Sequence, residues 1–292
     1  MDSHPYLSQF YFFKPTISNS YDYYSALWRL GDIFIKGSSA VQTKRDALFV
    51  DISRKDLSAR MQEVLQKGPT RDMLQKYPLQ TTSGWSPDCL RNAIFDGNRI
   101  KLYLYRPFDI RYIYYDDQLL GRSRLAVSHH LLSSNLALVT LRQTVDDEFR
   151  HVLVSSQICD INLLISHHVS DRVFPLYLYP PKSENKAGIG VTRERMIKEL
   201  VKTIGKIGKA KDLVGERDPI ENLVKRLFPQ RHYPRWPNLH PFFIKDLSQH
   251  LELEFVPDGR GDLEETFGPE DVFHYIYAVL HSPTYRERYK EF

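Results

Sequence analysis

Five short strand-like runs, separated by turn signals, occupy the middle of the 292-residue chain. They are residues 100–105, 111–115, 136–142, 151–154 and 161–166. Strands this short, joined by turns more often than by helices, favour hairpin pairing over the repeated strand–helix–strand unit of a parallel sheet. The sequence therefore predicts an α+β fold with a central antiparallel or mixed β-sheet region, flanking helices and a helical C-terminal part.

Helical patterns lie on both sides of this strand-rich middle. Leu57, Met61 and Leu65 recur at helical spacing after a capping residue, which is either Asp51 or Ser53. Nearer the C-terminus, prolines at first helical positions indicate further helices. These are expected at residues 218–227, from Pro269 onward with Phe273, Ile276, Tyr277 and Leu280 facing inward, and at residues 284–292.

Local patterns predict four more elements. Residues 28–35 and 47–52 are typical of short strands, and residues 124–132 of a helix between two central strands. Residues 174–181 contain three prolines, and proline cannot donate to a strand ladder. This last run is therefore expected to be an extended edge segment.

The chain divides by pattern into three parts that are expected to form one compact unit. Residues 1–181 hold the strand-rich core and an N-terminal arm, residues 182–236 a basic helical insert, and residues 237–292 a helical segment packing on the core. Between residues 182 and 235, fourteen lysines and arginines stand against seven acids. Either a solvated helical face or contact with nucleic acid explains such an excess.

The composition is that of an ordinary globular protein, with 42% hydrophobic and 26% charged residues and a net charge of +4. No run approaches the roughly 20 apolar residues of a membrane helix, so no membrane partner is expected. Cys89 and Cys159 are the two cysteines, which is too few for a disulfide framework and lacks the paired spacing of a zinc site. A reducing, cytoplasmic setting fits best.

No motif of autonomous catalysis stands out. Residues 179–182 lack the polar acceptor and the aromatic that frame the prolines of an adenine methyltransferase loop, and residues 205–210 lack the hydroxyl residue of a phosphate loop. The adjacent pairs His129–His130 and His167–His168 should point their rings apart, so they do not suit zinc. The acids of residues 258–265 are typical of a turn. We expect no catalytic residue and no metal site.

Residues 104–116 combine Arg106 and Arg111 with four tyrosines. Arginines among aromatics suit a strip that binds a polyanion, and the same composition suits a half-buried strand with a polar edge. Asp109 lies between the two arginines in sequence and is expected to be their ion-pair partner rather than a general base.

Four ordered segments together match a known family. They are residues 42–50 (QTKRDALFV), 105–112 (YRPFDIRY), 174–180 (FPLYLYP) and 266–286 (TFGPEDVFHYIYAVLHSPTYR). In this order and spacing they resemble the C-terminal specificity domain of the type ISP restriction–modification enzymes, over nearly the whole chain from about Trp28. The usual N-terminal modules are missing, and residues 182–236 match no pattern of the family.

In that family one bacterial polypeptide joins a nuclease, an ATP-driven translocase, an N6-adenine methyltransferase and this last domain, for defence against phage. The resemblance implies sequence-specific binding of double-stranded DNA by a domain that is not itself an enzyme. Its second partner would be the methyltransferase domain or subunit. S-adenosylmethionine, ATP and Mg would serve only the absent modules, so no cofactor is expected in this chain.

Arginine forks suit guanine and phosphate, whereas glutamine suits adenine, so these side chains on loops are the candidates for DNA contact. Arg106 and Arg111 lie in a family-wide motif and are expected to fix the scaffold or touch phosphate. The full set of candidates is Lys44, Arg45, Arg106, Arg111, Arg122, Arg124, Arg142 and Gln143.

Two other functions stay open at this stage. One is a methyltransferase or nuclease subunit with unrecognised chemistry, and the other is a protein-interaction module of the same system. Steep weakening of binding by salt would distinguish DNA binding from the interaction module.

Overall fold

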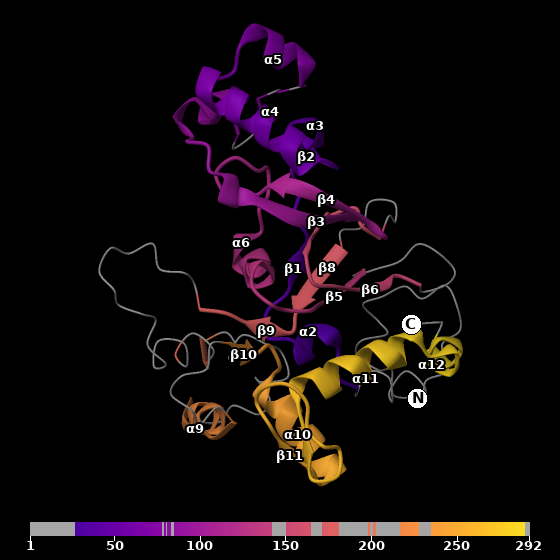
Figure 1. The fold of residues 1–292 in the computed structure, drawn as a ribbon. Coiled ribbons are helices and arrows are strands. Elements are labelled where there is room, and N and C mark those ends of the chain that lie inside the picture. The colour runs from indigo at the N-terminus through magenta and orange to yellow at the C-terminus, as the bar shows by residue number, and fades with distance from the viewer. Residues whose placement is uncertain are drawn as a thin grey trace, which may run out of the picture.

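The structure is a computed structural model that describes residues 27–77, 79, 81–82, 85–141, 150–164, 171–180, 198, 201–202, 217–227 and 235–289. It confirms the predicted α+β class, and the strand-rich middle consists of two four-stranded sheets (Figure 1). Most of the basic insert lies outside the described residues, so the division into three parts stays a prediction.

The first sheet is antiparallel throughout, in the order β1-β8-β5-β6. Its two faces bury different cores. Leu138 and Phe174 point into a core shared with the C-terminal helices, whereas Val139 and Val173 point into a smaller core under α6. The strands are β1 (Ser38–Ser39), β8 (Asp171–Pro175), β5 (Ala137–Leu141) and β6 (Val152–Ser155).

The second sheet is mixed, in the order β2-β4-β3-β7. The hairpin of β3 and β4 dominates it, and β7 pairs with β3 in parallel. The strands are β2 (Val50–Asp51), β4 (Asp109–Tyr114), β3 (Ile100–Arg106) and β7 (Ile158–Cys159).

Helices at the upper end of Figure 1 pack against the second sheet. The apolar positions Leu57, Met61 and Leu65 are buried as predicted, and the Ser53 side chain accepts a hydrogen bond from the Asp56 amide, so Ser53 is the cap. These helices are α3 (Asp46–Phe49), α4 (Arg54–Lys67), α5 (Arg71–Lys76) and two 3-10 helices, Pro87–Asn92 and Gly97–Arg99.

The C-terminal helices lie at the other end of the molecule, against the first sheet (Figure 1). Phe273 and Ile276 are buried there as predicted, and Tyr277 and Leu280 pack against the same core. The C-terminal helices are α9 (Arg217–Leu227), α10 (Pro241–Leu251), α11 (Pro269–His281) and α12 (Pro283–Tyr289), and the N-terminal helix α2 (Leu30–Ile33) joins the same core. Two small strand pairs complete this end: β9 (Tyr177–Leu178) with β10 (Trp236–Pro237), and β11 (Glu254–Phe255) with β12 (Thr266–Phe267).

Three predicted strands are wrong in part. Residues 30–33 form the helix α2, and the run at 47–52 is a helical turn before it becomes β2. Residues 161–164 form a turn, and the strand lies just before them, in β7. Runs this short carry too few positions for their period to distinguish a strand from a helical turn.

The sequence predicts an extended edge segment at residues 174–181. This prediction is wrong for residues 174 and 175, because they belong to β8, which has a hydrogen-bonded strand on each side. Pro175 is the last residue of β8, so its missing amide hydrogen does not interrupt the ladder. Residues 125–132 form α6 (Leu125–Ser128) and a following 3-10 turn, as predicted. Among the described helices, none is both long and apolar enough to cross a membrane.

Asp171, at the start of β8, is a buried carboxylate with few partners. Its Oδ2 accepts from the Leu164 amide at 3.1 Å, and its Oδ1 has no hydrogen-bond partner within the described part of the chain. Burial raises the pKa of Asp171 to about 7. Because the unfolded carboxyl ionises near pH 4, the unfolded chain releases this proton first as pH rises.

Wild-type protein should therefore lose stability relative to Asp171→Asn as the pH rises from about 4 to about 7. Thermal melts of both proteins at pH 5 and pH 8 measure this difference. Burial lowers the pKa of His240 to about 4, which acts in the opposite direction, but both proteins share that residue. Parallel pH profiles of the two proteins would contradict the prediction.

Candidate nucleic-acid interface

Two loops that are distant in sequence are joined by their backbones on one surface. The Gln42 amide donates to the Arg122 carbonyl at 3.0 Å, and the Arg122 amide donates back to Gln42 at 2.8 Å. The Gly121 amide donates to the Thr43 carbonyl at 3.3 Å. These bonds place the loop of Lys44 beside the loop of Arg122, so two separately predicted candidates share one site.

Lys44 is exposed and lies across Gly121. A Cβ atom at position 121 would be 2.9 Å from Lys44 Cγ and 3.2 Å from the Gln42 carbonyl oxygen. Only glycine leaves room for this close approach. The aliphatic part of the Lys44 side chain therefore lies against the loop that carries Arg122.

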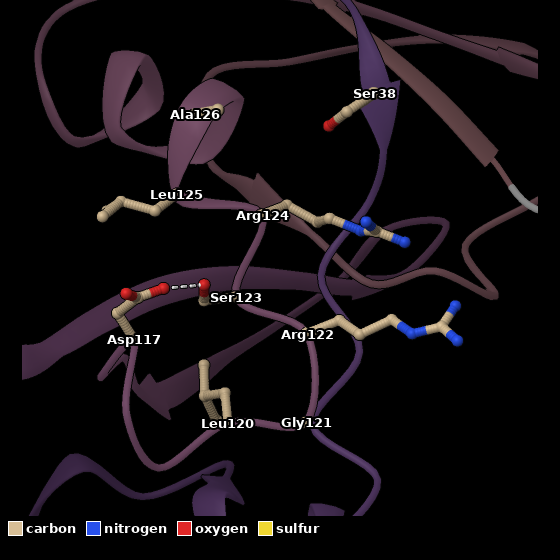
Figure 2. A pocket seen from close by; sticks show the side chains of 9 residues that line it. All are labelled: Ser38, Asp117, Leu120, Gly121, Arg122, Ser123, Arg124, Leu125 and Ala126. Carbon is tan, nitrogen blue, oxygen red and sulfur yellow. Dashed lines mark hydrogen bonds between the residues drawn. The ribbon is translucent and has the colours of Figure 1, made fainter. Parts of the chain in front are cut away.

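Arg122 and Arg124 line one open depression of about 420 Å³. Figure 2 shows the two side chains extending in the same direction. Arg122 is exposed and Arg124 half-buried, and neither has a carboxylate partner among the described residues. Burial, and then the charge of Arg122, lowers the pKa of Arg124. The lining residues are Ser38, Asp117, Leu120, Gly121, Arg122, Ser123, Arg124, Leu125 and Ala126.

Two of these cations have left-handed backbones. Lys44 has φ of 60°, and Arg124 has φ of 54° and ψ of 38°. This conformation costs a residue other than glycine about 1 kcal/mol, so the surroundings must hold it in place. For Arg124, the carbonyl accepts from the Val127 and Ser128 amides at 2.9 and 2.8 Å.

One acid, Asp117, lines the same depression, and it is already bonded. The Ser123 hydroxyl donates to Asp117 Oδ1 (Figure 2). The Ser123 carbonyl accepts from the Tyr115 hydroxyl at 2.9 Å. These two bonds hold Ser123, the residue between Arg122 and Arg124, in place. Ser38 of β1 also lines the depression, and no signal in its local sequence indicated this role.

Arg45 is placed differently from its neighbour Lys44. Its residue exposure is 6%, and its guanidinium carbon lies 3.3 Å from the centre of the Trp85 ring. Its Nη2 donates to Thr82 Oγ1 at 3.4 Å, and burial lowers the pKa of Arg45. Packing on Trp85 thus draws the Arg45 side chain inward, and its contact with DNA stays a prediction.

Arg106 and Arg111 belong to the β3–β4 hairpin, which matches the half-buried strand interpretation. Their guanidinium carbons lie 4.0 and 4.1 Å from the centre of the Tyr105 ring. Arg111 pairs with Asp109 at 2.7 Å as predicted, but Arg106 pairs instead with the buried Asp160 at 2.8 Å. Since both charges have carboxylate partners, these arginines stabilise the scaffold.

The remaining candidates give a mixed result. Arg142 and Gln143 lie outside the described residues, and so do His167 and His168. The prediction that the rings of His129 and His130 point apart is wrong, since their centroids are 3.7 Å apart in the turn that ends α6. Within the described residues, no three His, Cys, Asp or Glu side chains gather to hold a metal ion.

His130 serves the scaffold. Its Nδ1 accepts from the Tyr179 amide at 2.9 Å, which ties the 3-10 turn after α6 to the end of β9. Burial lowers the pKa of His130 to about 2, so its ring is neutral at ordinary pH.

A two-sheet scaffold whose backbone-linked loops present cations without carboxylate partners, as far as the chain is described, is typical of a binding domain for a polyanion. The chain belongs to the Type ISP C-terminal specificity domain family, whose model matches residues 32–292. No curated protein matches the chain.

Two solved structures share the fold. A DrdV–DNA complex determined by cryo-electron microscopy has a TM-score of 0.52 and 18% identity, over 89% of this chain and 20% of that one. The ATP-dependent Type ISP restriction–modification enzyme LlaBIII, bound to DNA, has a TM-score of 0.51 and 18% identity, over 89% of this chain and 14% of that one. The chain thus spans a fifth or less of either protein.

Proposed function

We propose that this chain recognises a specific sequence in duplex DNA as the specificity domain of a restriction–modification enzyme. The observation that carries the proposal is the cluster of Lys44, Arg122 and Arg124, three cations without carboxylate partners in the described part of a Type ISP specificity domain. The DNA-bound state of the DrdV and LlaBIII structures, which have a similar fold, supports it.

In this proposal the chain supplies recognition and a methyltransferase domain or subunit supplies the chemistry. S-adenosylmethionine, ATP and Mg belong to those other modules, and the assembly works in the cytoplasm. Lysines and arginines of the chain bind phosphates and set the register, while a smaller number of side chains reach base edges.

Selection of binding sites from random duplex DNA tests the proposal. The purified chain, alone and joined to its methyltransferase partner, should enrich one asymmetric sequence, and its binding should weaken steeply between 50 and 200 mM salt. Failure of both forms to enrich any sequence would end the claim of specific recognition. Methyl transfer by the chain alone would assign it an enzymatic role instead.

A second candidate, a module that binds another protein, is favoured by the tip of the β3–β4 hairpin. Phe108 is 97% exposed there, and Ile110 is 51% exposed. Exposed apolar groups of this size are typical of surfaces that a protein partner covers. A salt-insensitive protein complex, together with no duplex binding at low salt, would favour this candidate over DNA recognition.

A further inference from the structure

We infer that the depression between Arg122 and Arg124 binds a single phosphate of the DNA backbone and sets register without reading bases. This inference rests on the proposed DNA-binding function and divides it into two tasks. The cluster holds the duplex, and sequence is read elsewhere on the domain. Three observations carry the inference: the charge, the free donors and the shape of the site.

The cluster has an excess of positive charge, with three cations against the one acid Asp117. Other arginines of the scaffold have carboxylates at short range: Arg60 with Asp51 at 2.6 Å, Arg106 with Asp160 at 2.8 Å, Arg111 with Asp109 at 2.7 Å and Arg235 with Asp258 at 2.8 Å. Arg122, Arg124 and Lys44 have none in the described chain, and Asp117 is occupied by Ser123. The net positive charge that results suits an anion.

The donors of the two guanidinium groups are free. Neither Arg122 nor Arg124 donates a side-chain hydrogen bond within the described residues, and the Nε atom of Arg124 is buried without an acceptor. A guanidinium whose other donors have no acceptor in the chain can make charge-assisted hydrogen bonds to an anionic oxygen in the depression. Two adjacent arginine forks can share the oxygens of one phosphate.

The shape of the site favours phosphate over a base edge. Base edges lie inside the grooves, and side chains that protrude into a groove read them. Phosphates project from the duplex and can enter a depression. Arg124 is further held by its left-handed backbone, and Arg122 by its two backbone bonds to Gln42, so the site is organised before DNA arrives.

The test uses the full chain with Arg122→Gln, Arg124→Gln and the double substitution. Fluorescence anisotropy gives the Kd for the selected duplex and for an unrelated duplex between 50 and 200 mM salt. Each single variant should weaken both duplexes alike, roughly tenfold at low salt, and reduce the slope of log K against log salt by about 1. The ratio of the two Kd values should not change.

Two controls separate charge from folding. Arg71→Gln removes an exposed arginine of α5 that does not line the depression, and it should leave the Kd and the slope unchanged. Arg122→Lys keeps the charge, so it should restore most of the slope that Arg122→Gln loses. Circular dichroism melts should superimpose for the Arg122 and Arg71 variants, because both side chains are exposed.

A scan with neutral methylphosphonate links identifies the phosphate directly. One substituted link should weaken the wild-type chain about as much as the double arginine substitution does, and the double variant should lose nothing further at that link. Additive losses at every link would overturn the inference, as would a loss confined to the selected duplex, which would indicate base reading. A wild-type chain that binds no duplex at low salt would overturn the proposed function together with the inference.

Discussion

Replacing Asp160 with alanine is expected to lower the free energy of unfolding by about 3–5 kcal/mol. The Asp160 side chain is 4% exposed and connects three groups. It accepts from the Tyr103 hydroxyl at 2.6 Å, from Arg106 Nη1 at 2.8 Å and from the Asn162 amide at 2.8 Å. Alanine would leave the fully buried Tyr103 hydroxyl and the Arg106 guanidinium without that acceptor.

Asp109→Ala is the matched control, because it removes the partner of the other arginine on Tyr105. The Asp109 and Arg111 side chains are 35% and 30% exposed, so this substitution should cost less than about 1 kcal/mol. Urea unfolding of both variants and the wild type measures the difference. Equal losses in the two variants would show that Asp160 does not hold the hairpin to β7.

Gly261→Ala should lower the free energy of unfolding by about 3 kcal/mol, at the upper end of the usual cost of overpacking. A Cβ atom at position 261 would lie 2.2 Å from the Thr266 carbonyl oxygen and 2.5 Å from Phe267 Cα, and both are backbone atoms. The Gly261 amide also donates to Asp271 Oδ2 at 2.7 Å, within the first turn of α11. The loop must therefore move away from β12 to admit a methyl group.

Gly31→Ala provides the contrasting substitution. Within the described part of the chain, no atom outside its own helix lies within 4 Å of a Cβ at Gly31. The residue sits inside α2, where alanine is favoured over glycine by roughly 1 kcal/mol. Thermal melts should show a lower Tm for Gly261→Ala and an unchanged or higher Tm for Gly31→Ala. A Gly261→Ala protein as stable as the wild type would mean that the loop yields without cost.

Elements with several turns and a capping residue could be predicted from the sequence. In α4, the three predicted apolar positions are buried and Ser53 caps the helix. In α11, the proline and the acids lie in the first turn as predicted, and Phe273 is buried. The signals at residues 28–35 and 47–52 were too short, and tertiary packing decided their form.

The candidate site could be predicted only as separate cations. Nothing in the local sequence indicates that Lys44 lies beside Arg122, because backbone bonds between distant loops create that contact. Lys44 and Arg45 are adjacent and both basic, and they differ in exposure because Trp85, far away in sequence, packs against one of them. Charge spacing alone does not contain this information.

The main-chain bonds between Gln42 and Arg122 have a consequence for how such a domain can change. The side chains of Gln42, Lys44, Arg122 and Arg124 make no hydrogen bond within the described residues, so the join between the loops does not depend on their identity. In the proposed function, substitutions there would strengthen or weaken the binding of DNA while the fold persists. If the cluster touches only phosphate, binding strength and target choice are separate properties that mutation can adjust one at a time.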